Sequence, residues 1–514
     1  MTPLTTDKPE HGRFFNFVRT SLQRLITGRG GAVYGGGFWH GRPVQAISTV
    51  TLLLTSLLAG CTVGPDYLKP DLTLNPFYSA EAVTPHAQGK PAPPLDQWWL
   101  GFSDPELTKI IQRALAQNFD IKASMERVLQ ARAAARAAGA RLLPAFDASA
   151  QMLVERQSLE SPIGSIAQTM PGYHRNGDLY DVGAAASWEI DLFGGLRRGE
   201  EAAKAEAEAA EAMQLGVRIS VVADAADAYL QVRGLKARLA VIQDLIATDS
   251  NLLDLVRLRK ANGMATDREV AQAEALLAQA RGMVPLLRIE LAAQLNRLDL
   301  LMGVQPGTYA EKLAAPASLP NIPPVSVTSS DLLRRRPDVI AAERAMAAAN
   351  ARIGAALADY YPKLSLSGLL GFESFSPTSL FKSATFQPMA IAGLRWRLFD
   401  FGAIDAEVAM ANAATREALA RYRHTVLRAA EDVENACVAL AQLELHRQEV
   451  VNQIDALTRA RDESQEAYRS GLIPLTDTLD ADRQLLVAED DLPRTQTDAA
   501  RAAVRLFRAL GGGW

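Results

Sequence analysis

The residue types that carry catalytic or metal chemistry are few in this chain and lie far apart. Its 514 residues include only two cysteines, Cys61 and Cys437, which excludes a disulfide framework and a four-cysteine zinc site. The six histidines lack the spacing of metal ligands; they are His11, His40, His86, His174, His424 and His446. We find no phosphate-binding lysine loop, no HExxH pair, no GxSxG elbow and no clustered Ser/His/Asp set. We therefore expect a protein that is not an enzyme, with no catalytic residue, no metal and no cofactor.

Cys61 is the one cysteine with a clear chemical prediction. It follows Arg42 and an apolar stretch of about 13 residues from Ala46 to Leu58, a pattern typical of a secretory signal. The residues Leu58-Ala59-Gly60-Cys61 resemble a bacterial lipobox, which implies cleavage before Cys61 and acylation of its thiol and new amino group. Several acyl chains on one residue give firm membrane anchoring. We assign 1–60 to a leader with a signal peptide; the alternative is a buried apolar segment with an incidental cysteine.

Charge and hydropathy exclude two further classes. The chain has 54 basic and 58 acidic residues, and this formal net charge of −4 argues against a nucleic-acid partner. No continuous apolar run reaches the roughly 18 residues of a membrane-spanning helix. A helical membrane protein is therefore not expected.

An internal repeat organises the remaining chain. Trp188 to Gly194 reads WEIDLFG, and Trp396 to Gly402 reads WRLFDFG at an offset of 208 residues. The same offset relates Gly263 to Gly471, Pro285 to Pro493 and Gly303 to Gly511. We predict two copies of one unit, with a lead-in and a proline-containing linker. The predicted segments are 61–103, 104–303 for the first unit, 304–329 for the linker, and 330–514 for the second unit.

Each unit shows the same order of predicted elements. A first helix begins at Ser103 or Asp104 and runs to about 141, and its counterpart covers 330 to about 359. Alternation of apolar and polar residues then predicts two strands per unit. These strands lie near 144–156 and 180–193 in the first unit, and near 362–373 and 388–399 in the second.

A very long helix follows each pair of strands, over 194–263 and 402–471. About 69 residues at 1.5 Å each span roughly 100 Å, which indicates coiled-coil packing. Thr266 and Glu269 predict a capping box for a returning helix near 266–303. The returning helix and the first helix of a unit, stacked end to end, together match one long helix.

Four strands with one apolar face cannot close around a lumen. Open strand edges are not tolerated in hydrocarbon, so a membrane sheet must pool strands from several chains. Three chains give about twelve strands, an even number within the range of outer-membrane barrels. Trp188 and Trp396, near the helix-side ends of their strands, are then candidates for interface aromatics. The alternative is a soluble sheet buried against helices.

Taken together, these motifs resemble those of the outer membrane factors, the TolC/NodT-like lipoproteins of RND-type tripartite efflux systems. The resemblance covers nearly all of 61–514. It is carried by Cys61 to Tyr67, Trp98-Trp99, Phe102, Asp104, Pro105, Leu107, Trp188 to Gly194, Arg336 to Val339, Leu398 to Asp400 and Ala509 to Trp514.

This resemblance implies an α+β membrane protein of the Gram-negative outer membrane, lipid-anchored and extending into the periplasm. The implied assembly is a homotrimer with a twelve-stranded β-barrel, four strands per chain, continuous with a long α-helical coiled-coil barrel. An equatorial belt is expected from the linker and the chain ends. The implied function is passive conduction of small molecules exported by an inner-membrane RND-type pump and a periplasmic adaptor. No nucleic acid takes part.

The resemblance also implies a gate at the periplasmic helix tips. Charged and aromatic residues near the second tip are the candidates: Tyr468, Arg469, Asp477, Asp480 and Arg483. The alternative is ordinary pairing three or four residues apart along a helix. The apolar tips themselves suit docking of the adaptor, or are only tight helical turns; they comprise Gly263, Met264, Thr266, Gly471, Leu472 and Pro474.

A competing function is a structural lipoprotein that tethers the outer membrane and conducts nothing. Such a protein explains a lipid anchor and long coiled-coil helices. It leaves the four alternating strands without a purpose, so we favour the exit duct.

Overall fold

The computed structural model describes residues 62–71, 75–83, 93–309, 319–325, 327 and 330–514. The predicted leader and Cys61 lie outside these residues. The unit considered below runs from Gly60 to Trp514.

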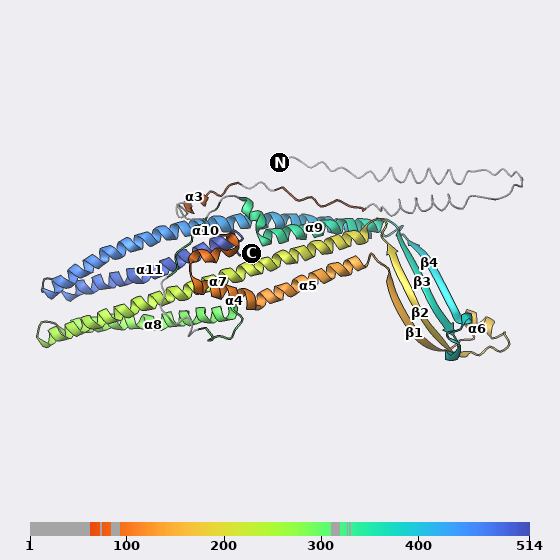
Figure 1. Cartoon of the computed structure of the whole chain (residues 1–514), viewed down its shortest axis with the longest axis horizontal. Helices are drawn as coiled ribbons and strands as arrows, with labels where there is room; N and C mark the ends of the chain where they lie inside the picture. The colour runs from red at the N-terminus through yellow and green to blue at the C-terminus, as the bar shows by residue number, and fades with distance from the viewer. Residues whose placement is uncertain (1–61, 72–74, 84–92, 310–318, 326, 328–329) are drawn as a thin grey trace. The chain divides into compact units, whose positions relative to one another are not determined.

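Two long helices, each followed by a shorter returning helix, dominate the described chain (Figure 1). The first pair is α7 (Gly195–Ala261) and α8 (Asp267–Leu301), and the second is α10 (Ala403–Arg469) and α11 (Leu475–Ala509). Both long helices have 67 residues and both returning helices have 35. Within the described residues, no helix is both long enough and apolar enough to cross a membrane.

The prediction of one continuous first helix over 104–141 is wrong. The structure has α4 (Pro105–Gln117) and α5 (Phe119–Ala140), separated by Asn118. The Asn118 side chain accepts hydrogen bonds from the amides of Asp120 and Ile121, as an N-cap does, and its amide nitrogen donates to the Leu301 carbonyl at 2.9 Å. The end of α8 therefore meets the break between α4 and α5. Asp104 caps α4 as predicted.

The counterpart in the second half is also divided. It consists of the 3₁₀ turn η3 (Ser330–Arg335), α9 (Pro337–Leu357) and the 3₁₀ turn η4 (Ala358–Tyr360). Pro337 stands at the first position of α9, where its missing amide hydrogen costs nothing. Upstream of α4 lie α3 (Ala80–Val83) and the 3₁₀ segment η2 (Leu95–Phe102).

The helices have a definite lateral order. α5 and α8 pack against α7, α7 packs against α9 and α11, and both α9 and α11 pack against α10. α5 and α8 therefore form one lateral edge of the helical wall, and α10 forms the other.

The sheet contains four antiparallel strands in chain order. They are β1 (Ala145–Arg156), β2 (Asn176–Ile190), β3 (Lys363–Ser374) and β4 (Phe386–Arg395). β2 starts earlier than the predicted 180, and β4 ends at Arg395 rather than near 399, so Trp396 and Leu398 follow the strand. The short α6 (Pro162–Ala167) lies between β1 and β2, and η5 (Pro377–Ser379) and η6 (Ser383–Thr385) lie between β3 and β4.

The strand register places the predicted apolar positions on one face of the sheet. Phe146 pairs with Ala186, which pairs with Gly368. Directly opposed residues of an antiparallel pair share a face, and so do alternate residues along a strand. The same face therefore carries the side chains of Trp188, Leu366 and Leu394.

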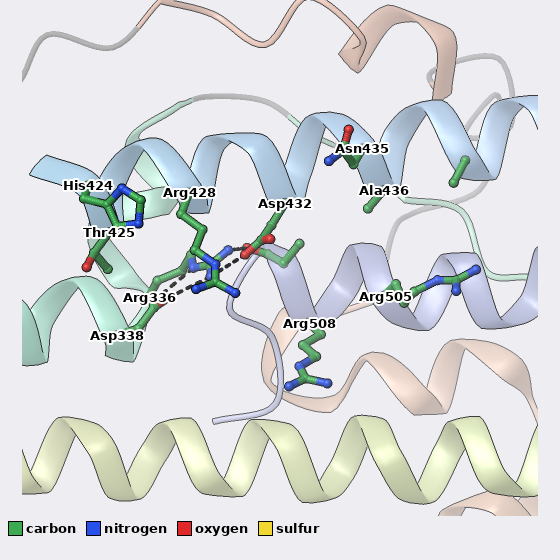
Figure 2. Close-up of a pocket in the computed structure, with 12 residues that line it drawn as sticks. Arg336, Asp338, His424, Thr425, Arg428, Asp432, Asn435, Ala436, Arg505 and Arg508 are labelled. Carbon is green, nitrogen blue, oxygen red and sulfur yellow. Dashed lines mark hydrogen bonds and ion pairs between the residues drawn. The ribbon is translucent and has the colours of Figure 1, made fainter.

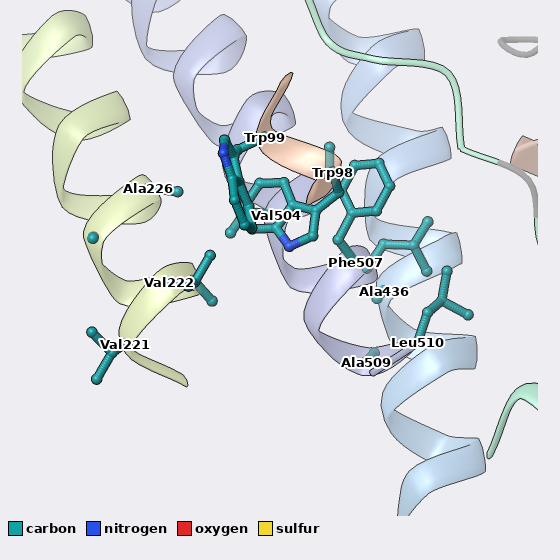
Figure 3. Close-up of a cluster of buried hydrophobic side chains, with 14 of the residues drawn as sticks. Trp98, Trp99, Val221, Val222, Ala226, Ala436, Val504, Phe507, Ala509 and Leu510 are labelled. Carbon is teal, nitrogen blue, oxygen red and sulfur yellow. The ribbon is translucent and has the colours of Figure 1, made fainter. Parts of the chain in front are cut away.

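The largest core lies where α7, α11 and η2 meet (Figure 3). Trp98 is 1% exposed, and its ring stacks on Phe507 with centroids 5.2 Å apart and planes within 7°. Val222 and Ala226 of α7 belong to the same cluster. This core joins the two predicted units through their long and returning helices, so neither unit packs independently of the other.

Candidate functional site

The two helix tips have the same backbone turn. After α7, Gly263 adopts a φ of +73°, and its amide and that of Met264 donate to the carbonyls of Lys260 and Arg259. After α10, Gly471 adopts a φ of +75°, and the amides of Gly471 and Leu472 make the equivalent bonds to Tyr468 and Ala467. This is the Schellman pattern, in which a left-handed glycine satisfies the last helix carbonyls. The glycines are thus required by the turn geometry.

The predicted tip residues differ in how they start the returning helices. Thr266 and Glu269 form the predicted capping box, in which each side chain bonds the other's backbone amide. Pro474 occupies the corresponding position before α11 and makes no side-chain cap. Met264 and Leu472 are exposed at the two tips, by 61% and 78%. Exposed apolar side chains on rigid turns are suitable for contact with another protein.

Tyr468 joins the two tips from inside the protein. Its ring is 3% exposed and packs in a small core with Val256 of α7 and Leu475 of α11. The Arg259 guanidinium lies over this ring, 4.2 Å from its centroid, and donates a 2.9 Å hydrogen bond to the Tyr468 carbonyl. Burial raises the pKa of the Tyr468 phenol, so the ring stays neutral and keeps its hydroxyl proton. Sequence reasoning identified Tyr468 and missed Arg259.

The other predicted gate residues lie on the exposed surface near the second tip. Arg483 pairs with Asp480 at 2.9 Å, and the second oxygen of Asp480 accepts from Gln484 at 2.6 Å, all within α11. Arg469 pairs with Glu466 at 3.6 Å within α10. Within one chain these residues make the helix-surface pairs that formed the alternative interpretation. Asp477 accepts a hydrogen bond from Thr476 beside it.

A second candidate site is the segment that follows Cys61, which we call the anchor strap (residues 62–69). Arg198 of α7 holds it: the guanidinium donates to the Val63 and Gly64 carbonyls at 3.2 Å and to Asp66 at 2.7 Å. Val63 donates its amide to Phe193 at 3.0 Å, at the connection from β2 to α7. The strap therefore begins where the sheet meets the helices.

The rest of the anchor strap crosses α9. A β-carbon on Gly64 would lie 2.5 Å from the Gly354 Cα, so the two backbones touch at this point. Tyr67 donates to Glu343 at 2.9 Å, and Lys69 pairs with the same carboxylate at 3.1 Å. Burial lifts the pKa of the Glu343 carboxyl, but its bonds with Arg344, Lys69 and Tyr67 outweigh this and lower it overall. The strap is thus fixed by charge as well as by shape.

Trp188 and Trp396 occupy matching places at the same end of the sheet. The Trp188 indole nitrogen donates to the Leu142 carbonyl at 2.9 Å, and that of Trp396 donates to the Tyr360 carbonyl at 3.0 Å. Leu142 and Tyr360 each lie shortly before the first strand of their half. Both indoles therefore present their rings at the sheet–helix junction with the N–H group already paired.

A polar cavity of about 750 Å³ lies between α10, α11 and the start of α9 (Figure 2). Arg336 bonds Asp338 at 2.8 Å, Asp432 at 2.9 Å and the Ala509 carbonyl at 3.0 Å. One guanidinium thus joins α9, α10 and the end of α11. The Arg336-Pro337-Asp338 motif was part of the sequence resemblance, and this contact gives it a structural role.

Comparison with known proteins agrees with this architecture. A model of the family described as outer membrane efflux protein matches residues 110–304 and 328–512. The pyoverdine export outer membrane protein OpmQ of Pseudomonas putida KT2440 is 33% identical over 468 residues, covering 90% of this chain and 96% of OpmQ. The outer membrane protein OprJ of Pseudomonas aeruginosa is 30% identical, covering 92% of this chain and 97% of OprJ. The solved outer-membrane channel OprN matches 88% of this chain and 100% of its own, with 31% identity and a TM-score of 0.80.

Proposed function

Because this chain belongs to the outer membrane efflux protein family, and is thus an outer-membrane component of an efflux system, we propose that three copies form one exit duct. In this duct the sheet lies in the outer membrane and the helices extend into the periplasm. The observation that carries the proposal is that the sheet and the helical wall have their free edges on the same two sides of the chain.

The first free edge consists of β1 and α5, which are joined by the short connection 141–144, together with α8. The second consists of β4 and α10, joined by 396–402. Among the described residues, β1 and β4 each pair with one strand. In a head-to-tail contact, β4 of one copy therefore pairs with β1 of the next copy. The same contact places α10 of the first copy against α5 and α8 of the next.

Exposed apolar side chains support this contact. On α10, Leu427, Val438 and Leu445 are exposed and recur at intervals of eleven and seven residues, which places them on one face. On the opposite edge Leu129 of α5 and Ile289 of α8 are exposed. Burying apolar stripes that a single chain leaves open favours closure of a ring, and a ring of three has about twelve strands.

The two matching halves support the proposed domain organisation. The long helices and the returning helices have equal lengths in the two halves, and the family match falls into two segments. We infer that 104–303 and 330–514 are copies of one unit. The segments 61–103 and 304–329 then contribute to a belt around the helices.

Lipid attachment at Cys61 agrees with where the anchor strap begins. A β-carbon on Gly194 would lie 2.8 Å from the Thr62 Cα, so Thr62 packs against the connection from β2 to α7. A neighbouring acylated cysteine would reach the membrane surface at the sheet–helix junction, beside Trp188 and Trp396. Aromatic residues at this level suit the interfacial girdle of an outer-membrane barrel.

At the opposite end, the helix tips are proposed to gate the duct and to receive a periplasmic adaptor. The exposed Met264 and Leu472 are the proposed contacts for the adaptor, and the acidic side chains of Asp477 and Asp480 are the proposed ring around the opening. An inner-membrane pump of the RND type supplies the energy, and the chain itself performs no chemistry. The alternative remains a non-conducting coiled-coil lipoprotein tethered to the outer membrane.

The test is reconstitution of the purified, lipid-modified protein in planar bilayers. We expect stepwise conductance, a trimer mass in mild detergent, and hypersensitivity to exported compounds in the deletion strain. A stable monomer without conductance would support the structural lipoprotein instead. The assignment to the outer membrane would be unaffected by that result.

A further inference from the structure

Two aspartates are buried in the seam where α7 packs against α11, close to the helix tips. Asp249 of α7 is 1% exposed, and Asp482 of α11 is 5% exposed. Neither carboxylate oxygen of Asp249 has a hydrogen-bond partner among the described residues, and the same holds for Oδ2 of Asp482. Burying an ionised carboxylate without partners is very unfavourable. These two groups therefore require an explanation.

Both aspartates occupy positions that the coiled-coil pattern reserves for apolar residues. On α7, Asp249 lies seven residues after Ile242 and seven before Val256, both of which are 0% exposed. On α11, Asp482 lies seven residues after Leu475, which is also 0% exposed. A polar residue at such a position lowers stability in exchange for a specific pairing. Because both acids lie at the spacing of the buried seam residues, the side chain of each one faces the helix that carries the other.

The pair is absent from the equivalent places of the repeat. At the offset of 208 residues, Asp249 corresponds to Leu457, and Asp482 corresponds to Glu274, whose side chain is 50% exposed. In the equivalent places of the repeat, the coiled coil therefore has an apolar residue, Leu457, and an acid at the surface, Glu274. The buried acids belong only to the seam that joins the two halves.

The surroundings offer little positive charge. From α10, Arg461 lowers the pKa of Asp482 and Asp462 raises it, and Gln465 donates to the Asp482 Oδ1 at 3.3 Å. Arg461 is itself bonded to Asp462 at 2.7 Å. Further along the seam, Glu489 of α11 and Asp244 of α7 add negative charge.

From α8, the neighbours in the tip core are the apolar Ala273 and Leu277. Glu274 of α8 pairs with Arg257 at the surface, and the side chains of both residues are about half exposed. Arg461, whose side chain is 24% exposed, therefore acts on Asp482 while it is already bonded to Asp462.

We propose that Asp249 and Asp482 form a proton-operated latch, which closes the seam between α7 and α11 when one proton is shared and loosens it when both are ionised. The proton comes from solvent and binds one carboxylate oxygen. The resulting hydroxyl then donates a hydrogen bond to the other carboxylate. One charge is removed and two polar groups gain a partner, so the seam becomes more stable. No other reactant is needed.

The titration range is mildly acidic. Burial, with the negative charge of Asp482, raises the pKa of Asp249 to about 6, and burial raises the pKa of Asp482 above its ordinary value. The folded seam therefore holds a proton at pH values where an exposed aspartate, with a pKa of about 3.9, has lost it. Stability from the latch is greatest in acid and is lost as the pH rises through about 6.

The consequence for the duct rests on the proposed function. α7 and α11 come from the two halves, and their tips carry the proposed gate. Loosening their seam lets the halves separate at the periplasmic end. We expect the closed tip to be favoured in acid and opening to be easier near neutral pH.

The experiment compares the full-length protein with Asp249→Asn, Asp482→Asn and the double variant, in detergent at pH 5 and pH 7.5. Asparagine mimics the protonated acid in shape and can donate a hydrogen bond. We expect Tm at pH 7.5 to rise by about 2 °C or more in each single variant. We also expect the rise in Tm that the wild type gains between pH 7.5 and pH 5 to be reduced in each single variant and lost in the double variant.

The matched control is Asp254→Asn, an α7 aspartate whose side chain is 74% exposed. It should keep the wild-type pH dependence. Infrared spectra give a direct second readout, because a protonated carboxyl band present at pH 5 should disappear in Asp249→Asn. A wild-type pH dependence in both asparagine variants, with an unchanged infrared band, would overturn the latch.

Conductance separates this proposal from the proposed function. If the wild type forms pores whose pH dependence survives in the asparagine variants, the duct stands and the latch does not operate the gate. If no variant forms pores while the Tm and infrared effects appear, the latch stands and the duct does not. We expect pores that open more readily at pH 7.5 than at pH 5 in the wild type only.

Discussion

Arg259 at the end of α7 and Tyr468 at the end of α10 are joined twice, by a cation–π contact of 4.2 Å and by a 2.9 Å hydrogen bond to the Tyr468 carbonyl. The two residues lie about one helical turn before the tip glycines Gly263 and Gly471, and their contact connects the two halves of the chain. It is therefore positioned to hold the two helix tips of the chain together.

Replacing Arg259 with alanine should loosen this connection. A hydrogen bond from a charged group contributes about 1.5–3 kcal/mol, and the cation–π contact adds about 0.5–1 kcal/mol at a partly exposed position. We expect a lower Tm and a higher mean single-channel conductance. Arg257→Ala is the control, because Arg257 pairs with Glu274 on the surface. Equal conductance in the two variants would show that Arg259 does not restrain the tips.

Replacing Asp480 with alanine tests the predicted gate ring. If Asp480 lines the constriction, its removal should raise single-channel conductance in planar bilayers. Arg483→Ala is the companion variant, since it keeps the carboxylate and removes its partner within α11. If both variants leave conductance unchanged and alter stability by no more than about 0.5 kcal/mol, their pairing belongs to the helix surface alone.

Removing the Arg198 side chain should release the anchor strap. This side chain is 5% exposed and donates to two strap carbonyls and to Asp66. Its loss removes this donor from the Val63 and Gly64 carbonyls, at a local cost of about 1–3 kcal/mol. We expect faster hydrogen–deuterium exchange of the Val63 amide in Arg198→Ala. The exposed Arg132→Ala variant should exchange like the wild type, and slow exchange in both would contradict this role.

Gly234 should not tolerate a side chain. A β-carbon there would lie 2.0 Å from the Thr497 Oγ1, because α7 and α11 approach closely at this point. Overpacking of this kind costs about 1–3 kcal/mol, so Gly234→Ala should lower Tm. Gly199, also in α7, has no described atom within 4 Å of such a β-carbon apart from its chain neighbours and the backbone of its own helix. Gly199→Ala should instead gain about 0.5–1 kcal/mol from helix propensity. Calorimetry of both variants would decide.

Cys437 should be inert in the folded protein. Burial raises the pKa of its thiol to about 11, and the side chain is 0% exposed. The nucleophilic thiolate is therefore almost absent at pH 8. We expect no labelling by maleimide in a Cys61→Ser background until the protein is unfolded. Rapid labelling of the native protein would show that α10 opens at this level.

Much of the architecture could be predicted from local patterns. The alternation in each unit located the four strands and their shared apolar face, although not the start of β2 or the end of β4, because side chains on a strand change sides at every residue. The glycines at 263 and 471 located the helix tips, because their left-handed backbone is costly for other residues. The continuous helix over 104–141 was wrong: Asn118 caps α5 through the amides of Asp120 and Ile121, and it also bonds the Leu301 carbonyl, which lies far away in the sequence.

The sequence by itself determined the lengths of the two long helices and their returning helices, the position of the turns, the faces of the strands and the resemblance around Cys61 and Trp514. These features depend on residues a few positions apart, where periodicity and backbone preference act directly. Only the tertiary structure decided that Arg259 meets Tyr468, that Arg198 fixes the anchor strap, and that Asp249 and Asp482 are buried in one seam. Such contacts join residues separated by more than a hundred positions, and they depend on how whole helices pack.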